Sequence, residues 1–135
     1  MKLYHRLAIA LFVSWLLVIA WIGTIWFLSS RSGEELSGYM IAIPNWDKIC
    51  HFIAFSAGGA AFAFAIRLTW KLSFGRAIVI SILAVALYGA IDEWHQTYTP
   101  GRSGADLYDW IFDLLGAVVG SFFMLTLYAR RSLTP

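Results

Sequence analysis

Four long apolar stretches dominate this 135-residue chain and restrict the folds that it can adopt. A helix needs about 20 mostly apolar residues to cross a hydrocarbon core about 30 Å thick. We therefore predict membrane-spanning helices over about residues 7–28, 49–68, 77–96 and 109–129. The first stretch is longer than the apolar core of a signal peptide, about 7–15 residues, so we expect it to be retained as a helix.

The composition excludes a soluble domain and a disordered chain. Hydrophobic residues make up 60% of the chain and charged residues only 13%, whereas soluble domains carry about 25% charged residues. The single cysteine excludes an internal disulfide, and a net charge of +2 without a basic run does not favour nucleic-acid binding. We predict an all-α polytopic membrane protein, with four transmembrane helices bundled in a single domain, residues 1–135.

Lysine and arginine residues predict the orientation, because they accumulate on the cytoplasmic side of a membrane. Seven lie at the chain ends and between the second and third stretches: Lys2, Arg6, Arg67, Lys71, Arg76, Arg130 and Arg131. Three lie on the opposite side: Arg31, Lys48 and Arg102. Both termini are therefore expected in the cytoplasm, and the lipid bilayer is the expected surrounding partner.

Polar residues open the second helix, at its predicted outer end. Asp47 and His51 are four residues apart and share one helix face, with Lys48 beside them. Asn45 or Asp47 is a suitable residue to cap the helix N-terminus. A polar group is therefore expected where this helix enters the membrane.

The third helix ends in a second polar group. Gly89, Asp92 and Gln96 are spaced to form one stripe, and Glu93 lies one position round the helix. His95 is expected to point away from this stripe. The acidic and amide side chains should therefore face the same neighbour.

A turn and a third polar stripe follow. Pro100-Gly101 is a turn signal that would bring Arg102 back over the mouth of the bundle. The fourth helix carries a continuous stripe that is acidic first and glycine-rich later: Asp106, Asp109, Asp113, Gly116 and Gly120. The last two form a GxxxG element, which is typical of close helix packing.

These charges need partners, because an ionisable group facing hydrocarbon costs about 2.5–3.5 kcal/mol. Acids outnumber the nearby cations, so some must be protonated, share a hydrogen bond, bind a cation or face water. We predict that six polar residues meet in one cavity at the outer face: Asp47, His51, Asp92, Gln96, Arg102 and Asp109. Each feature also has a structural alternative. Asp47 and Lys48 would be a helix cap and a snorkelling lysine, and His51 a satisfied interior histidine. Asp92, Glu93 and Gln96 would form an ion-pair network with Arg102 across the loop, and Asp109 and Asp113 would lock the fourth helix to Lys48 or to backbone donors.

In this order the motifs resemble the VanZ-like family. The resemblance rests on Asp47-Lys48-x-x-His51, Asp92-Glu93-x-x-Gln96, Pro100-Gly101-Arg102 and Asp109-x-x-x-Asp113-x-x-Gly116. It covers nearly the whole chain, with one departure at Asp113, where many members have Asn. The resemblance implies a small four-helix protein of the bacterial cytoplasmic membrane. The family takes its name from an accessory protein of teicoplanin resistance, and no settled reaction accompanies it.

The first functional hypothesis is an outer-leaflet site that binds or processes an envelope lipid or a lipid-linked cell-wall precursor, linked to glycopeptide (teicoplanin) resistance. Lysine supplies a point charge to a phosphate, arginine supplies a planar fork, and a carboxylate can act as general base. The catalytic candidates are Asp92, Glu93 and His51. The ligand-binding candidates are Asp47, Lys48, Gln96, Arg102, Asp109 and Asp113.

Two further hypotheses compete with the lipid site. The first is a divalent metal cofactor, because carboxylates and one imidazole suit Mg²⁺, Mn²⁺, Ca²⁺ or Zn²⁺. The metal-ligand candidates are Asp47, His51, Asp92, Glu93, Asp109 and Asp113. The second is a non-enzymatic scaffold whose acidic cluster is structural. An ion channel is disfavoured, because all the acids lie at one end of the helices.

Overall fold

The chain is helical throughout its regular structure. The computed structural model describes the backbone of residues 2–39 and 43–132 and the side chains of residues 4–39 and 43–130. Its helices are α1 (Lys2–Ser29), α2 (Gly33–Ser37), α3 (Trp46–Trp70), α4 (Phe74–Gln96) and α5 (Leu107–Ser132), and no strand occurs in these residues. Four stretches are long and apolar enough to cross a membrane: Tyr4–Ser29, Trp46–Trp70, Phe74–Gln96 and Leu107–Arg130. The prediction of an all-α polytopic membrane protein is confirmed.

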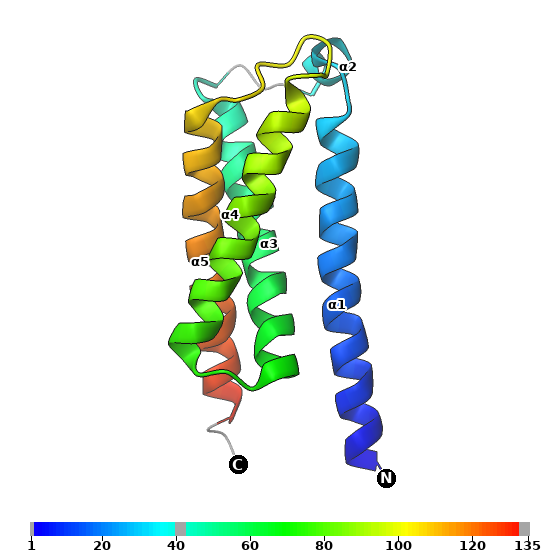
Figure 1. The fold of residues 1–135 in the computed structure, drawn as a ribbon, viewed down its shortest axis with the longest axis vertical. Helices are drawn as coiled ribbons and strands as arrows, with labels where there is room; N and C mark the ends of the chain where they lie inside the picture. The colour runs from blue at the N-terminus through cyan, green and yellow to red at the C-terminus, as the bar shows by residue number, and fades with distance from the viewer. Residues whose placement is uncertain (1, 40–42, 133–135) are drawn as a thin grey trace.

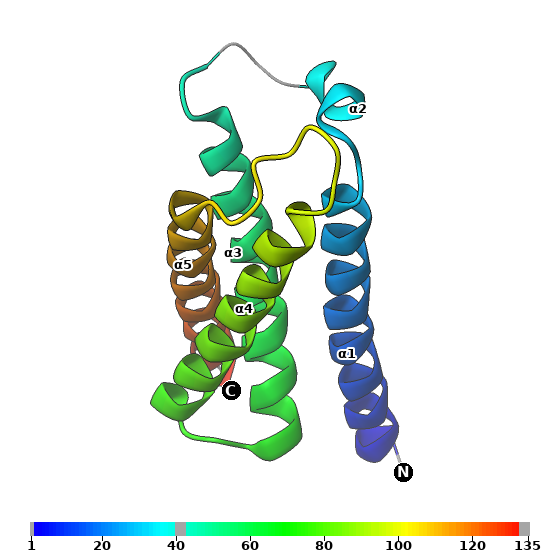
Figure 2. The ribbon, with the colours of Figure 1, turned by 45° about the horizontal axis from the view of Figure 1, so that its top comes forward.

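The long helices stand side by side (Figure 1). α3, α4 and α5 pack on one another, and α1 packs against α3 and α4 but not, within the described residues, against α5. The start of α1, the α3–α4 turn and the end of α5 lie at one end of the molecule. α2 and residues 97–106 lie together at the other end, which we call the polar end (Figure 2).

The side of the membrane that each end faces stays a prediction from the lysine and arginine positions. The side chains of Lys2 and Arg131, which contribute to that prediction, lie outside the described residues.

The starts of two spanning helices differ from their predicted positions. α3 begins at Trp46 and α4 at Phe74, a few residues before the expected starts at about 49 and 77. Asn45 occupies the predicted N-cap position of α3 but does not cap the helix with its side chain. It has a left-handed φ of 58°, and Asp47 lies inside the first turn. The first turn of α3 therefore contains the polar residues Asp47 and Lys48.

The short helix α2 lies in a segment that was expected to be a loop. Ser32 Oγ accepts a hydrogen bond from Glu35 N at 3.2 Å, and Glu35 Oε2 accepts one from Ser32 N at 2.8 Å. This reciprocal capping box stabilises the first turn of a helix. Gly33 N also donates to Pro100 O at 3.0 Å, which joins α2 to the segment before α5.

Small residues bring α3 and α5 into backbone contact. A Cβ atom added at Gly116 would overlap Phe52 O, and one at Gly120 would overlap Ser56 O. From the other side, a Cβ atom at Gly59 would overlap the backbone of Ala117. The GxxxG element is therefore a packing device, as its spacing indicates.

Aromatic side chains dock α1 on the other helices. Trp21 Nε1 donates to Ala54 O at 2.8 Å, and the Trp21 ring packs edge-on against Phe55 with centroids 5.3 Å apart. Tyr88 OH donates to Ile22 O at 2.8 Å. Both hydrogen bonds are partly buried and satisfy polar groups that would otherwise lie unpaired against apolar side chains. They hold α1 beside α3 and α4 below the polar end.

Candidate functional site

Lys48 joins the starts of α3 and α5. Its Nζ atom lies 3.0 Å from Asp47 Oδ2, 2.9 Å from Asp106 Oδ2 and 2.8 Å from Asp109 Oδ1, and only 14% of the side chain is exposed. Asp106 lies outside the spanning helices, and its hydrogen bond from Lys48 holds the pKa of its carboxyl below the usual range. The ammonium is thus surrounded by carboxylates. This arrangement corresponds to the structural alternative in which Lys48 is locked to the fourth spanning helix.

His51 lies one turn deeper, between two acids of α5. Its Nδ1 atom is 2.9 Å from Asp113 Oδ1, and its Nε2 atom is 3.9 Å from Asp109 Oδ2. Asp113 is fully buried, and its Oδ2 atom has no hydrogen-bond partner in the described residues. The short contact between His51 Nδ1 and Asp113 Oδ1 fixes the orientation of the imidazole ring and places Nε2 on the side of Asp109.

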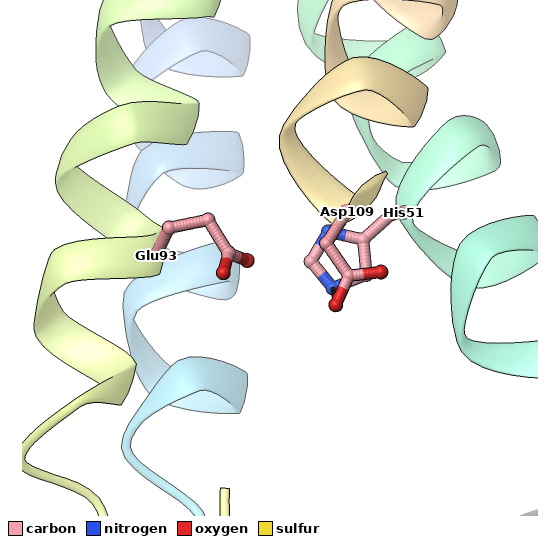
Figure 3. A group of neighbouring side chains, drawn as sticks. All are labelled: His51, Glu93 and Asp109. Atoms are coloured by element: carbon pink, nitrogen blue, oxygen red, sulfur yellow. Dashed lines mark ion pairs between the residues drawn. The ribbon is translucent and has the colours of Figure 1, made fainter. Parts of the chain in front are cut away.

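Glu93 reaches the same place from α4. Its Oε2 atom accepts a hydrogen bond from Asp106 N at 2.8 Å, while Oε1 is buried and has no partner in the described residues. Figure 3 shows the carboxylate pointing toward His51 and Asp109. One ligand atom from each of these three residues lies within 4.8 Å of the others. We call His51, Glu93 and Asp109 the three-residue group.

Arg102, Gln96 and Asp92 form a separate chain of hydrogen bonds. Arg102 Nη2 donates to Gln96 Oε1 at 2.7 Å, and Gln96 Nε2 donates to Asp92 Oδ2 at 2.8 Å. Arg102 Nη1 also reaches Leu28 O at 3.4 Å. The expected alternative, an ion pair between Arg102 and the acids of α4, is not formed in the described residues. The guanidinium is instead positioned by an amide and a main-chain carbonyl.

Residues 97–106 are hydrogen-bonded to α1 and α4, which positions Arg102. Thr99 Oγ1 donates to Ser29 O at 3.1 Å, and Ala105 N donates to Glu93 O at 3.1 Å. Gly101 has a left-handed φ of 71°, which glycine adopts without strain, and Ala105 has a φ of 63°, which is uncommon for a residue with a side chain. The turn signal at Pro100-Gly101 therefore marks a real reversal of the chain, and Arg102 returns over the bundle.

A cavity of about 410 Å³ opens beside these groups at the polar end. Its polar lining contains all six residues that were predicted to converge: Asp47, His51, Asp92, Gln96, Arg102 and Asp109. Its apolar lining includes Ile25 and Leu28 of α1 and Ala54 and Phe55 of α3. The helical spacing therefore identified the polar side of the cavity correctly, while the functional roles of these residues stay predictions.

Three other predicted site residues lie behind the cavity wall. Lys48, Glu93 and Asp113 are absent from the cavity lining. Lys48 contacts Asp109 and Asp113 contacts His51, and both of these partners line the cavity. Glu93 contacts Asp106, at the end of the segment 97–106. His95 lies outside the cavity, stacked on Trp26 with centroids 4.0 Å apart, as its helical phase predicts.

Sequence reasoning missed the contribution of α1 and of Asp106. The apolar stretch that forms α1 gives no signal that Ile25 and Leu28 line a cavity, because every face of that stretch is apolar. Asp106 was recognised as part of the acidic stripe, but not as a partner of Lys48. Asp106 is three residues before Asp109, and this spacing could have indicated that both acids reach the same lysine.

Comparison with protein families gives one match that covers most of the chain. The family model described as VanZ/LLP1 matches residues 12–128. Comparisons with curated proteins and with solved structures give no match. The matched range includes every residue of the cavity lining described above.

Proposed function

The chain belongs to the VanZ/LLP1 family, and from this premise we propose that its cavity binds a phosphate-bearing envelope lipid or lipid-linked cell-wall precursor. We place this binding at the extracytoplasmic face of the bacterial cytoplasmic membrane, in accord with the positions of lysine and arginine. The observation that carries the proposal is a cavity with an arginine at its polar side and an apolar wall built from two membrane-spanning helices.

Arg102 is the group that would receive the phosphate. A guanidinium has five N–H donors in a planar fork that matches phosphate oxygens. In the described residues one contact goes to Gln96 and a longer one to Leu28, so donors remain for an anion in the cavity. Lys48, the other candidate, is already held by three acids and does not line the cavity. We assign it a structural role.

The apolar wall suits the hydrocarbon part of the ligand. Ligand cavities usually measure about 300–1,000 Å³ and are mostly apolar with a few placed polar groups. A cavity of about 410 Å³ is large enough for a head group and the first carbons of its chain. Because the wall consists of spanning helices, the remaining chain would lie among the bilayer lipids. Glycopeptide resistance would follow if the bound lipid carries the cell-wall precursor.

The direct test is mass spectrometry of the protein released from nanodiscs under native conditions. The wild type should retain a phosphate-containing lipid, Arg102→Lys should retain less because it loses the planar fork, and Arg102→Gln should retain none. Arg31→Gln is the matched control, since Arg31 is outside the cavity lining and pairs with Glu35 at 3.2 Å. Equal lipid retention by Arg102→Gln and wild type contradicts the proposal and favours the scaffold hypothesis.

A further inference from the structure

We propose that the three-residue group, His51, Glu93 and Asp109, binds one divalent transition-metal ion beside the cavity. The three residues come from α3, α4 and α5, so the site exists only when these helices are packed together. Two of the three, His51 and Asp109, also line the cavity. A bound ion would therefore have protein ligands on one side and the cavity on the other.

The distances describe an open site that must close on binding. Ligand atoms of the group lie within 4.8 Å of one another, and His51 Nε2 is 3.9 Å from Asp109 Oδ2. Two ligand atoms of a tetrahedral ion with bonds of about 2.1 Å are about 3.4 Å apart. The pair of His51 and Asp109 must therefore close by about 0.5 Å and a pair at the 4.8 Å limit by about 1.4 Å, a movement that side-chain rotation can supply.

Each member of the group is held from outside by a second contact. His51 Nδ1 is held by Asp113, Asp109 Oδ1 by Lys48, and Glu93 Oε2 by Asp106 N. Histidines that bind metals almost always donate their other ring N–H to a carboxylate or carbonyl, which fixes the tautomer. The contact with Asp113 would fix the tautomer in this way here, and it places Nε2 on the side of Asp109.

The unpartnered oxygen of Glu93 is an independent indication of a ligand. The residue is 5% exposed, its Oε1 atom has no hydrogen-bond partner in the described residues, and the carboxylate points toward the other two members (Figure 3). A buried carboxyl oxygen without a hydrogen-bond partner is unfavourable. A metal ion would satisfy it.

The charge balance at the polar end favours a cation. Six carboxylates gather there: Asp47, Asp92, Glu93, Asp106, Asp109 and Asp113. The fixed positive charges beside them are Lys48 and Arg102. Buried charges are retained when they are paired or bind a metal, and a divalent ion would offset two of the surplus negative charges.

The donor set selects the class of ion. Imidazole suits Zn²⁺ and its neighbours, while carboxylates also suit Mn²⁺. Three protein ligands leave at least one coordination position open, and the exposure of His51 and Asp109 to the cavity directs that position toward it. If the proposed function holds, a phosphate bound at Arg102 would occupy this position; the metal site itself does not depend on the proposed function.

The test measures metal binding without any lipid substrate. Full-length protein in detergent is freed of metal with EDTA and titrated by calorimetry with Zn²⁺ and, separately, with Mn²⁺. We expect one equivalent of at least one ion to bind to the wild type. His51→Gln and Glu93→Gln should each weaken binding about ten-fold or more, and Asp113→Asn should weaken it about 10–100-fold through the orientation of His51.

Matched controls separate the site from general damage. His95→Gln and Glu34→Gln replace a histidine and an acid outside the three-residue group and should bind the ion as the wild type does. Absorption of bound Co²⁺ gives a second readout that reports the ligand set and should change in Asp113→Asn. Failure of the wild type to bind either ion overturns the proposal, as does unchanged affinity in folded His51→Gln. If the ion binds but no phosphate-containing lipid is retained, the metal site stands and the proposed function fails alone.

Discussion

At the scale of single residues, Gly89 makes room for Asp113. A Cβ atom at position 89 would lie 2.8 Å from Asp113 Oδ2 and 3.2 Å from the ring of Phe55. Asp113 is fully buried and reaches His51 from this position. The small residue on α4 therefore determines how closely an acid of α5 can approach the histidine of α3.

Replacing this glycine should disturb the metal site more than the fold. In Gly89→Ala, the added Cβ atom displaces Asp113, which lowers the stability of the fold. The higher helix propensity of alanine, about 1 kcal/mol, offsets this loss. We expect a small change in thermal stability and a loss of Zn²⁺ affinity of about ten-fold. Gly75→Ala is the matched control, because a Cβ atom at that position meets nothing within 4 Å. Equal Zn²⁺ affinity in both variants would show that the depth of Asp113 does not matter.

A second residue-scale prediction concerns Glu35 and pH. The backbone hydrogen bond from Ser32 holds the pKa of this carboxyl below its usual value of 4.5. A lowered folded-state pKa means that the stabilisation of α2 is present above about pH 4.5 and is lost as the pH falls through the lowered pKa.

Hydrogen exchange over residues 30–38 can follow this loss. Glu35→Ala should exchange faster than the wild type at pH 7, and the ratio of the two rates should approach one as the pH falls through the lowered pKa of Glu35. Glu34→Ala, which alters the neighbouring acid but not the capping box, should exchange as the wild type does. A rate ratio that stays constant with pH would mean that ionised Glu35 does not hold the helix.

At the scale of helices, the backbone contact between α3 and α5 holds two ligands of the three-residue group together. Gly120→Leu must push the helices apart, because even a Cβ atom would overlap Ser56 O. Overpacking a tight contact costs about 1–3 kcal/mol, and we expect the upper part of that range. Gly23→Leu is the control, since no atom lies within 4 Å of a Cβ atom there. Unfolding in mixed detergent should show the loss for Gly120→Leu alone.

The helix scale also explains which features could be predicted from the sequence. The four spanning helices could be predicted because each apolar stretch is long enough to cross a bilayer. Helical spacing within each stretch predicted that Asp47, His51 and Asp109 face the interior of the bundle. Spacing gives the face of a residue but not what lies in front of it. It therefore did not distinguish His51, which lines the cavity, from Lys48, which lies behind it. The five-residue helix α2 depends on the capping box and on a contact with Pro100 that is distant in sequence.

At the scale of the whole molecule, the polar groups and the cavity share one end, opposite the start of α1 and the end of α5 (Figure 1). The lysine and arginine positions predict that this end faces outward. If so, a lipid would be received from the outer leaflet. The orientation is therefore the whole-molecule property on which the proposed function depends.

Cysteine labelling in intact cells tests the orientation. In a Cys50→Ser background, which removes the one native thiol, Gly38→Cys and Ser103→Cys should react with a membrane-impermeant maleimide. Ser73→Cys, in the exposed turn between α3 and α4, should react only after the cells are opened. Thr134, a further position expected inside, lies outside the described residues. Labelling of Ser73→Cys in intact cells would reverse the orientation.

The docking of α1 has a consequence for how this sequence can vary among relatives. Trp21 and Tyr88 donate their hydrogen bonds to main-chain carbonyls, at positions 54 and 22. A carbonyl is present whichever amino acid occupies those positions, so the acceptor side tolerates substitution within the limits of size. The donor side does not, because few side chains combine a large ring with a terminal N–H or O–H group. Among relatives we therefore expect substitutions at the acceptor positions 54 and 22, and retention of the donors Trp21 and Tyr88.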